Sequence, residues 1–318
     1  MVLRCAILDD YQNVALSSTD WSKVGGDVEI KVFNAHLGST DKVVAALKDF
    51  AIICAMRERT VFPRAVIEAL PSLKLLITSG MRNASIDLAA AKARGVVVCG
   101  TPSFGNGTAA IATGLMLELA RGIGYENARL KAGVPWQSTI GLDLEGLTLS
   151  LAGLGRLGAR MAEIGRAFKM TVIAWSQNLT PEKCAEAGVA CVSRDEMFRR
   201  ADFLSIHLQL SDRTRGLVGA RELGLMKKTA YLINTSRGPI VEEAALLTAL
   251  RDKRIAGAGL DVFDIEPLPV DHPLRKLDNV VLTPHLGYVA AQNYRAFFGG
   301  MVDDIRAFLD GKPVRVLT

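Results

Sequence analysis

Three ionisable side chains, Arg237, Glu266 and His285, each come a few residues after a short apolar run in the second half of the chain. Such runs predict buried strands of a parallel sheet, and ligands bind outside the carboxyl ends of such strands. A guanidinium, a carboxylate and an imidazole at that edge are suited to acid–base chemistry on an anionic substrate. The three runs are residues 230–234, 256–261 and 280–283.

A glycine-rich segment, residues 153–158, reads G-x-G-x-x-G and lies between an apolar run at 147–152 and a helix-like stretch at 157–169. A second apolar run follows at 170–175, so the order is strand, glycine loop, helix, strand. Such a loop lets the backbone approach a pyrophosphate closely, while the helix N-terminus supplies N–H groups and a positive dipole end. In this setting the motif predicts a dinucleotide site.

Apolar runs alternate with amphipathic helical stretches along the whole chain, which predicts an α/β protein with parallel sheets. In the first part we expect strands at 3–8, 28–33, 51–55, 74–78 and 96–99, and helices at 42–48, 63–70 and 87–93. A break rich in proline and glycine at 102–107 precedes a helix at 109–121 and predicts a domain boundary. Further strands are expected at 147–152, 170–175, 190–192, 203–206, 230–234, 256–261 and 280–283, and a last helix at 290–309.

The chain has 318 residues, which is long for one hydrophobic core and predicts two domains. None of its apolar runs reaches the length of a membrane span, and acidic residues directly after the first apolar run predict a strand there and not a signal peptide. The net charge of +5 is spread along the chain, which argues against nucleic-acid binding. We predict no metal site.

The five cysteines form no C-x-x-C pair and lie mostly in apolar runs. We expect them to be small buried residues of a protein kept in a reducing compartment, the cytoplasm. They are Cys5, Cys54, Cys99, Cys184 and Cys191.

Four motifs together resemble the D-isomer-specific 2-hydroxyacid dehydrogenases, and the resemblance covers nearly the whole chain. Residues 148–158 match the cofactor loop of that family, 234–239 its arginine motif, 261–267 its acidic motif and 283–287 its histidine motif. The family includes phosphoglycerate and D-lactate dehydrogenases and glyoxylate or hydroxypyruvate reductases. The resemblance implies an oxidoreductase that transfers a hydride between a nicotinamide cofactor and a small 2-keto or D-2-hydroxy acid.

The resemblance also implies the architecture. It predicts two doubly wound parallel-sheet domains, with a Rossmann cofactor domain inserted in a flavodoxin-like substrate domain. Residues 1–100 and 288–318 would form the substrate-binding domain, because the last helix returns to it, and residues 101–287 would form the NAD(P)-binding domain.

Three catalytic roles follow from the resemblance. His285 would be the general acid that protonates the developing alkoxide, a task suited to an imidazole. Glu266 would hydrogen-bond the ring of His285, hold its orientation and favour its protonated form. Arg237 would bind the substrate carboxylate and stabilise negative charge on the carbonyl oxygen.

The resemblance places further residues at the site. The amides of Ser79 and Gly80 would hold the substrate carboxylate. Arg57 resembles an arginine that members of the family often direct into the cleft, where it would bind substrate; a solvated loop charge is the other interpretation. Asp261 would accept a hydrogen bond from the nicotinamide carboxamide. We expect the other histidines, His36, His207 and His272, to lack the setting of His285, with His207 meeting the cofactor through its backbone. The cofactor would contact Gly153, Gly155, Arg156, Leu157, Gly158, Ser176, His207, Thr235, Asp261 and Gly287.

The chain departs from the family pattern at the end of the second strand of the cofactor domain. NAD-binding members usually have an acidic residue there, and this chain has Ser176, so the repulsion that excludes a 2′-phosphate is absent. NADP-preferring members often have an arginine at the following position, where this chain has Gln177. NADP is therefore favoured over NAD, although the arginine that would bind the 2′-phosphate is missing. A second departure is Ala110, where relatives usually have a glutamate.

The segment 130–145 has several glycines, one tryptophan and no clear period, so we expect a long irregular loop. Relatives are commonly homodimers, and this segment fits an arm between subunits. Two other functions stay open. A formate dehydrogenase would need a glutamine in place of Glu266, and a non-catalytic NAD(H)-sensing corepressor would carry segments beyond the last helix, which is soon followed by the end of the chain at Thr318.

Overall fold

The computed structural model describes residues 2–105 and 107–318. The chain divides into two compact units. Unit 1 consists of Met1–Phe104 and Ala290–Thr318, and unit 2 of Gly105–Val289. We describe each unit by itself.

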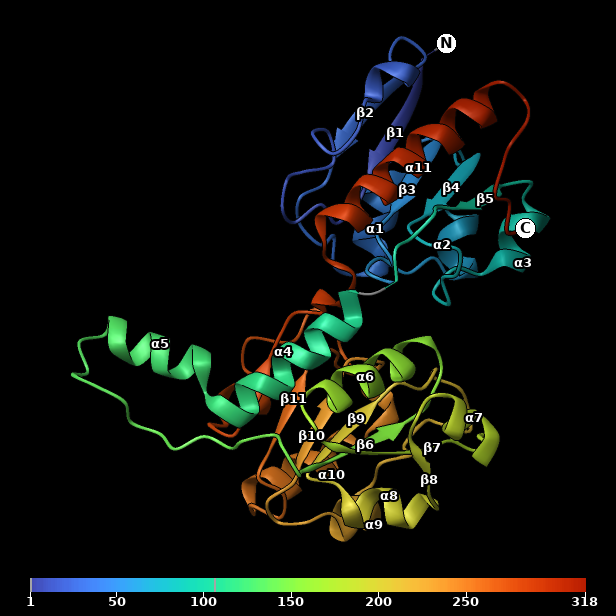
Figure 1. The fold of residues 1–318 in the computed structure, drawn as a ribbon. Helices are drawn as coiled ribbons and strands as arrows, with labels where there is room; N and C mark the ends of the chain where they lie inside the picture. Colours follow the sequence, from blue (N-terminus) through green and yellow to red (C-terminus); the bar gives the residue numbers. More distant parts are fainter. Residues whose placement is uncertain (1, 106) are drawn as a thin grey trace. The chain divides into compact units, whose positions relative to one another are not determined.

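Unit 1 contains a parallel five-stranded sheet in the order β2-β1-β3-β4-β5 (Figure 1). This is the order of flavodoxin-like sheets, in which the chain reverses its winding between β1 and β3. The strands are β1 (Leu3–Ile7), β2 (Val28–Val32), β3 (Ile52–Ala55), β4 (Leu75–Thr78) and β5 (Val97–Gly100). The helices are α1 (Thr40–Leu47), α2 (Arg64–Glu68), α3 (Leu88–Ala93), α11 (Ala291–Leu309) and the short 3₁₀ helix η1 (Trp21–Val24).

Helices cover both faces of this sheet. The apolar sides of α1, α2 and α3 pack against the strands in one hydrophobic cluster, which includes Leu47, Ile67 and Ala90. The long helix α11 packs on β4 and β5, with Phe298 and Met301 fully buried. In Figure 1, α11 lies along the strands of unit 1.

Unit 2 contains a parallel seven-stranded sheet in the order β12-β11-β10-β9-β6-β7-β8. The strands are β6 (Thr148–Ala152), β7 (Thr171–Trp175), β8 (Ala190–Cys191), β9 (Phe203–Ile206), β10 (Tyr231–Asn234), β11 (Gly257–Leu260) and β12 (Val280–Leu282). The helices are α4 (Gly107–Arg121), α5 (Ile123–Lys131), α6 (Arg156–Ala167), α7 (Pro181–Glu186), α8 (Arg194–Arg200), α9 (Ala220–Leu225) and α10 (Glu243–Arg251), with 3₁₀ helices η2 (Gly238–Ile240), η3 (Pro273–Lys276) and η4 (Leu286–Tyr288).

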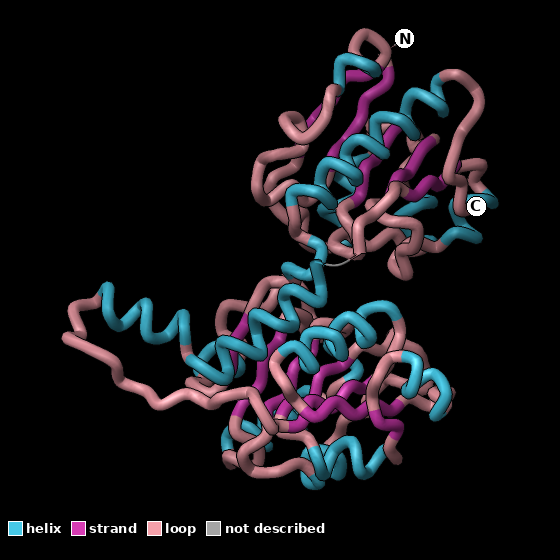
Figure 2. Tube along the Cα trace, viewed as in Figure 1, coloured by secondary structure: helices cyan, strands magenta, loops and turns pink. Residues whose placement is uncertain are grey.

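Two apolar layers enclose this second sheet. Leu149 and Leu151 of β6 pack with α4 and α6 on one face. Leu204 and Ile206 of β9 pack with α8, α9 and α10 on the other. Figure 2 shows helices on both sides of the strands in each unit. The predicted fold class, α/β with two doubly wound parallel sheets, is confirmed.

Helix α5 is not part of the prediction, which has residues 130 and 131 in an irregular loop. The model places them in the last turn of α5, and an irregular segment follows. No residue of α5 is buried, so this helix lacks the buried apolar side on which the prediction of helices depends. A residue of the preceding helix binds the first amides of α5: the carboxylate of Glu118 accepts the N–H groups of Gly124 and Tyr125 at 2.7 and 3.2 Å. In Figure 1, α5 and the segment after it extend away from α4.

Four of the five cysteines are buried as expected, but Cys191 is exposed. The prediction is wrong there because Cys191 lies on β8, a two-residue strand at the edge of the sheet. Within residues 2–105 and 107–318, no helix is long and apolar enough to cross a membrane. The same residues hold no group of three or more His, Cys, Asp or Glu side chains arranged for a metal ion.

Candidate active site

The glycine loop between β6 and α6 is tightly packed at two of its glycines. Gly153 has a φ of +102°, and a Cβ atom there would lie 2.6 Å from the carbonyl oxygen of His207. A Cβ atom on Gly158 would collide with the carbonyl of Gly153. Only glycine therefore lets the loop and the start of α6 pack against the end of β9.

The third glycine faces open space. A Cβ atom on Gly155 would have no atom within 4 Å, and Gly155 is the residue before α6. Gly155 and Arg156 are exposed, whereas Leu157 is partly buried. The guanidinium of Arg156 rests against Gly105. The first amides of α6 therefore border space that an anion could fill, beside the guanidinium of Arg156, which fits the pyrophosphate of a dinucleotide.

Two more predicted cofactor residues carry buried polar atoms at the same edge of the sheet. Within residues 2–105 and 107–318, neither Thr235 Oγ1 nor His207 Nδ1 has a hydrogen-bond partner. The other ring nitrogen of His207 is 2.9 Å from the hydroxyl of Ser205, and burial lowers the pKa of His207 to about 4. Such unpaired buried groups are uncommon and are expected where a ligand completes the site. Ser176 follows β7 directly and is half-buried.

The loop that carries Arg237 is fixed by Asn234 at the end of β10. The Asn234 side chain accepts the amide of Ser236 at 3.0 Å and donates to the carbonyl of Arg237 at 2.9 Å. The hydroxyl of Ser236 donates to the carbonyl of Ile206 at 2.8 Å, which ties this loop to the end of β9. Arg237 is partly buried. Its guanidinium is therefore carried on a loop with a defined backbone at the strand ends.

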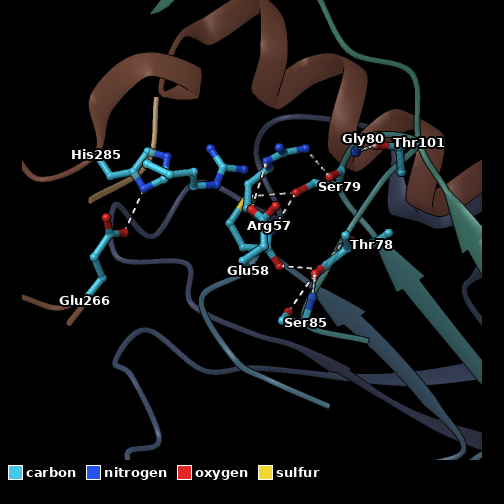
Figure 3. A network of polar contacts seen from close by, with 12 residues as sticks. Arg57, Glu58, Thr78, Ser79, Gly80, Ser85, Thr101, Glu266 and His285 are labelled. Carbon is cyan, nitrogen blue, oxygen red and sulfur yellow. Dashed lines mark hydrogen bonds and ion pairs between the residues drawn. The ribbon is translucent and has the colours of Figure 1, made fainter. Parts of the chain in front are cut away.

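Glu266 and His285 are in direct contact. Oε2 of Glu266 lies 2.7 Å from Nδ1 of His285, and Figure 3 shows the carboxylate pointing at the ring. Oε1 of Glu266 accepts the amide of Phe263 at 3.0 Å, so both carboxylate oxygens are engaged. A carboxylate bonded to Nδ1 fixes the ring orientation and directs Nε2 away from it. The arginine and acidic loops also touch, since a Cβ atom on Gly238 would overlap the backbone of Phe263.

Asp261 holds the turn that carries His285. One carboxylate oxygen accepts the hydroxyl of Thr283 at 2.6 Å and the amide of Leu286 at 2.7 Å, and the other accepts the amide of Gly287 at 2.9 Å. His285 has a φ of +53°, in the left-handed region that is uncommon for a histidine. Asp261 is fully buried, and burial is the main cause that raises its pKa. The sequence did not indicate these partners of Asp261.

The start of α4 packs on the same turn. The hydroxyl of Thr108 donates to the carbonyl of Gly287 at 3.2 Å. A Cβ atom on Gly107 would lie 2.7 Å from that same carbonyl oxygen. Helix α4 therefore also supports the turn that follows His285.

In unit 1, Arg57 and Ser79 lie together at the ends of β3 and β4. The amide of Arg57 donates to the Ser79 hydroxyl at 2.8 Å, and Nη1 of Arg57 donates to the Ser79 carbonyl at 3.0 Å (Figure 3). The predicted use of the Ser79 and Gly80 amides is wrong for this structure. The Ser79 amide donates to the carbonyl of Ala55 at 3.0 Å, and the Gly80 amide donates to the Thr101 hydroxyl at 2.9 Å. Hydrogen bonds within unit 1 thus already occupy both amides.

Comparison with known proteins decides the family. Residues 113–287, more than half of the chain, match the model of the NAD-binding domain of the D-isomer specific 2-hydroxyacid dehydrogenases. The chain belongs to this family. It is an oxidoreductase with a nicotinamide cofactor.

Individual relatives agree with this assignment. A glyoxylate reductase of Aeropyrum pernix is 39% identical over 252 residues, which cover 73% of this chain and 75% of the relative. A D-3-phosphoglycerate dehydrogenase of Methanocaldococcus jannaschii is 35% identical over 86% of this chain, but the chain spans only 52% of that relative. The crystal structure of a phosphoglycerate oxidoreductase from Vibrio cholerae superposes with a TM-score of 0.93 at 33% identity, covering 98% of this chain and 100% of the other. The corepressor and formate dehydrogenase alternatives are not favoured.

Two histidines outside the predicted set of this dehydrogenase also have carboxylate neighbours. His36 Nδ1 is 3.3 Å from Asp9, and His272 Nε2 is 3.1 Å from Glu243. The prediction that these histidines lack such a setting is therefore wrong. Both partners lie more than 25 residues away in the sequence, so no local pattern indicates them.

Proposed function

We propose that this enzyme reduces small 2-keto acids to D-2-hydroxy acids with Arg237, Glu266 and His285 as its catalytic set. The observation that carries the proposal is the 2.7 Å contact between Glu266 and Nδ1 of His285. It leaves Nε2 as the ring nitrogen that faces a substrate. The D configuration of the product rests on family membership.

Each residue of the set has a distinct task. Nε2 of His285 donates a proton to the carbonyl oxygen as negative charge develops there. Glu266 stabilises the charged imidazole and keeps its orientation. Arg237 binds the substrate carboxylate through two parallel N–H donors and stabilises charge on the carbonyl oxygen. In unit 1 we assign Arg57 a role in substrate binding.

The cofactor would lie along the carboxyl edge of the unit 2 sheet. Gly155, Arg156 and the first amides of α6 would hold its pyrophosphate. The hydroxyl of Thr235, which has no hydrogen-bond partner among the described residues, would contact the nicotinamide end of the cofactor. The bound nicotinamide supplies the hydride. Ser176 would contact the adenosine ribose. Because Ser176 has no carboxylate to repel a 2′-phosphate, we favour NADP over NAD.

We further propose that the enzyme is a homodimer joined through α5 and residues 132–145, here called the arm. The arm exposes large apolar side chains, which a partner copy would cover. They include Ile123, Tyr125, Leu130, Trp136 and Ile140, exposed by 51–102%.

A steady-state assay tests the catalytic proposal. Glyoxylate, hydroxypyruvate, pyruvate and bulkier 2-keto acids would each be offered with NADH and with NADPH, and we expect turnover of at least one. His285→Ala should lower the turnover number by ~10²–10⁴-fold, since proton transfer contributes that much. The matched control is His272→Ala, which removes the other unit 2 histidine that contacts a glutamate. An unchanged rate in His285→Ala would remove His285 from the mechanism.

A further inference from the structure

Two cysteines of unit 2 come together at the edge of its sheet. Cys184 lies on α7 and Cys191 on β8, and α7 packs against β8 beside β7 (Figure 1). A tight turn joins the two elements, in which the amide of Val189 donates to the carbonyl of Cys184 at 2.9 Å. Both cysteines are free thiols. The turn therefore brings the chain back from α7 to the sheet and returns the second cysteine to the first.

The side chain of Cys191 points to the face of the sheet on which Cys184 is buried. Cys191 pairs with Ala174 of β7, and paired residues of neighbouring strands share a face. Ala174, Val189 and Cys184 belong to one apolar cluster on that face. Val192, the next residue after Cys191, packs on the opposite cluster, as the alternation of side chains along a strand requires. The two sulfur atoms therefore lie on the same side of the sheet.

The two thiols differ in what can reach them. Cys184 is 1% exposed, whereas Cys191 is exposed to solvent. An oxidant dissolved in water therefore meets Cys191 first. Burial and, after it, the neighbouring thiol of Cys191 raise the pKa of Cys184 to about 12, so Cys184 stays protonated and inert until the sulfur beside it becomes electrophilic. An accessible thiol with a resolving thiol beside it is typical of redox sensing.

We propose that Cys191 and Cys184 form a reversible disulfide when the protein meets hydrogen peroxide, and that this bond weakens binding of the dinucleotide cofactor. The thiolate of Cys191 attacks the peroxide, the O–O bond breaks, and a sulfenic acid and hydroxide form. The thiol of Cys184 then attacks the sulfenic sulfur, gives its proton to the hydroxide and displaces the hydroxyl group, so that two waters result once the proton lost by Cys191 is counted. Two thiols lose two electrons, and the peroxide gains them.

Strand β7 connects this pair to the cofactor site. Cys191 pairs with Ala174, just before Ser176, and the amide of Val192 donates to the carbonyl of Ala174 at 3.1 Å. The turn from Ser176 leads into α7, and the amide of Leu179 donates to the carbonyl of Ser176 at 3.1 Å. Both partners of the disulfide are thus attached to the backbone around Ser176.

Closing the bond should move this backbone. An S–S bond is about 2.05 Å long, which is shorter than any contact between unbonded sulfur atoms, so its formation draws α7 and β8 together. We expect Ser176 to be displaced as a result. The effect on the cofactor rests on the proposed function, in which Ser176 contacts the adenosine ribose. In a compartment that keeps thiols reduced, such a bond is transient and serves regulation.

The test measures the bond and its effect separately on the whole protein. After treatment with hydrogen peroxide, mass spectrometry of a digest should show a link between Cys184 and Cys191 that dithiothreitol removes. Fluorescence titration with NADPH and with NADH should give a Kd at least fivefold higher after oxidation, since one lost hydrogen bond weakens binding by roughly that factor. Cys5 and Cys54, whose thiols lie 4.0 Å apart but are both buried, are the internal control and should stay reduced.

Two variants separate the roles of the cysteines. Cys191→Ser should bind the cofactor as the wild type does and lose its response to peroxide. Cys184→Ala should form a sulfenic acid at Cys191 that dimedone traps, with no disulfide and no change in Kd. Cys99→Ala, at a buried cysteine of unit 1, is the matched control and should respond as the wild type does.

If peroxide produces no link between Cys184 and Cys191, the inference is overturned. A link that leaves Kd unchanged overturns it as well. So does a rise in Kd for oxidised Cys184→Ala as large as that for the wild type, because the disulfide would then not be the cause. In these three cases a reduced protein that binds the cofactor and reduces a 2-keto acid leaves the proposed function standing. If the reduced protein binds neither NADPH nor NADH, the proposed function and this inference fall together.

Discussion

Asp261 fixes the backbone of His285 from both sides of the histidine. Its carboxylate accepts the hydroxyl of Thr283, two residues before His285, and the amides of the two residues after it. The histidine between these anchors has a φ of +53°, a conformation that costs about 1 kcal/mol or more without such support. The buried carboxylate therefore acts as a positioning residue for the imidazole that we propose as the acid.

Replacing Asp261 by asparagine should lower kcat while the protein stays folded. The amide NH₂ of asparagine cannot accept one of the two backbone amides, so the turn can relax and displace His285. A misplacement of about 1 Å costs on the order of 10²-fold in rate. We expect kcat to fall ten- to a hundredfold, with a smaller change in KM for the keto acid.

The control for this variant is Asp264→Asn, three residues along and exposed. Kinetics with varied keto acid and varied cofactor separate two roles of Asp261. A change confined to the KM for the cofactor would assign Asp261 to the carboxamide alone and contradict the positioning role.

Glu266→Gln should lower kcat by about 10²-fold or more. Glutamine keeps the shape of the side chain and can still accept a hydrogen bond from Nδ1, but it carries no charge to stabilise the imidazolium. Glu243→Gln is the matched control, because Glu243 contacts His272 at a similar distance of 3.1 Å. If both variants keep the wild-type kcat, the carboxylate is not needed at His285.

The contacts around His285 mark the limit of what the sequence could predict. Apolar runs indicated every strand to within one or two residues. Most of these strands are buried on both faces, and such a parallel strand is a continuous apolar run. The motif pattern likewise indicated Glu266 and His285, whose contact the structure then shows. Local periodicity carries the strands, and the resemblance to the family implied the pairing of Glu266 with His285.

Contacts between loops could not be predicted in this way. The hydroxyl of Thr101 accepts the amide N–H of Gly80, a residue 21 positions earlier in the sequence. Asp9 contacts His36, which lies 27 positions later in the sequence. Helix α5 was missed for a related reason, since Glu118 of the preceding helix holds its first amides. These arrangements depend on which strand ends become neighbours in the sheet, and a single sequence does not show that.

The stability of the protein should depend on pH through Asp304 of α11. Burial raises the pKa of Asp304 from its ordinary value of 3.8 to about 7, and nearby Arg315, 2.8 Å away, opposes this. Between these two pH values the folded protein holds a proton that the unfolded chain has lost. The free energy of unfolding should therefore fall as pH rises from about 4 to 7, by at most roughly 1.4 kcal/mol per pH unit from this group.

Urea unfolding of the wild type and of Asp304→Asn at several pH values measures this term. The difference in unfolding free energy, wild type minus variant, should decrease steadily between pH 5 and 7 and level off above. Asp303→Asn, at the exposed neighbouring position, should show a much weaker trend, because the charge of Asp303 is only a minor cause of the raised pKa of Asp304. A difference that is constant with pH would mean that Asp304 titrates alike in both states.

The arm should hold two copies of the chain together. Trp136 is 71% exposed and Ile140 fully exposed in the single chain, and a partner copy would bury them. Trp136→Lys with Ile140→Asp should shift sedimentation from dimer to monomer at micromolar concentration, because a charge in a buried apolar contact is costly. Val270→Asp, at an exposed valine outside the arm, is the control. A dimer in all three proteins, or a monomeric wild type, would contradict the proposed interface.

Ser176→Asp should move the cofactor preference from NADPH towards NADH. Ser176 directly follows β7, where a carboxylate would bond the ribose hydroxyls and repel a 2′-phosphate. We expect the ratio of kcat/KM for NADPH to that for NADH to fall at least tenfold, about 1.4 kcal/mol of discrimination. Asn178→Asp places the same charge two residues further along, on an exposed side chain, and should change the ratio much less. Equal shifts in the two variants would show that the charge acts at a distance and that Ser176 does not meet the ribose.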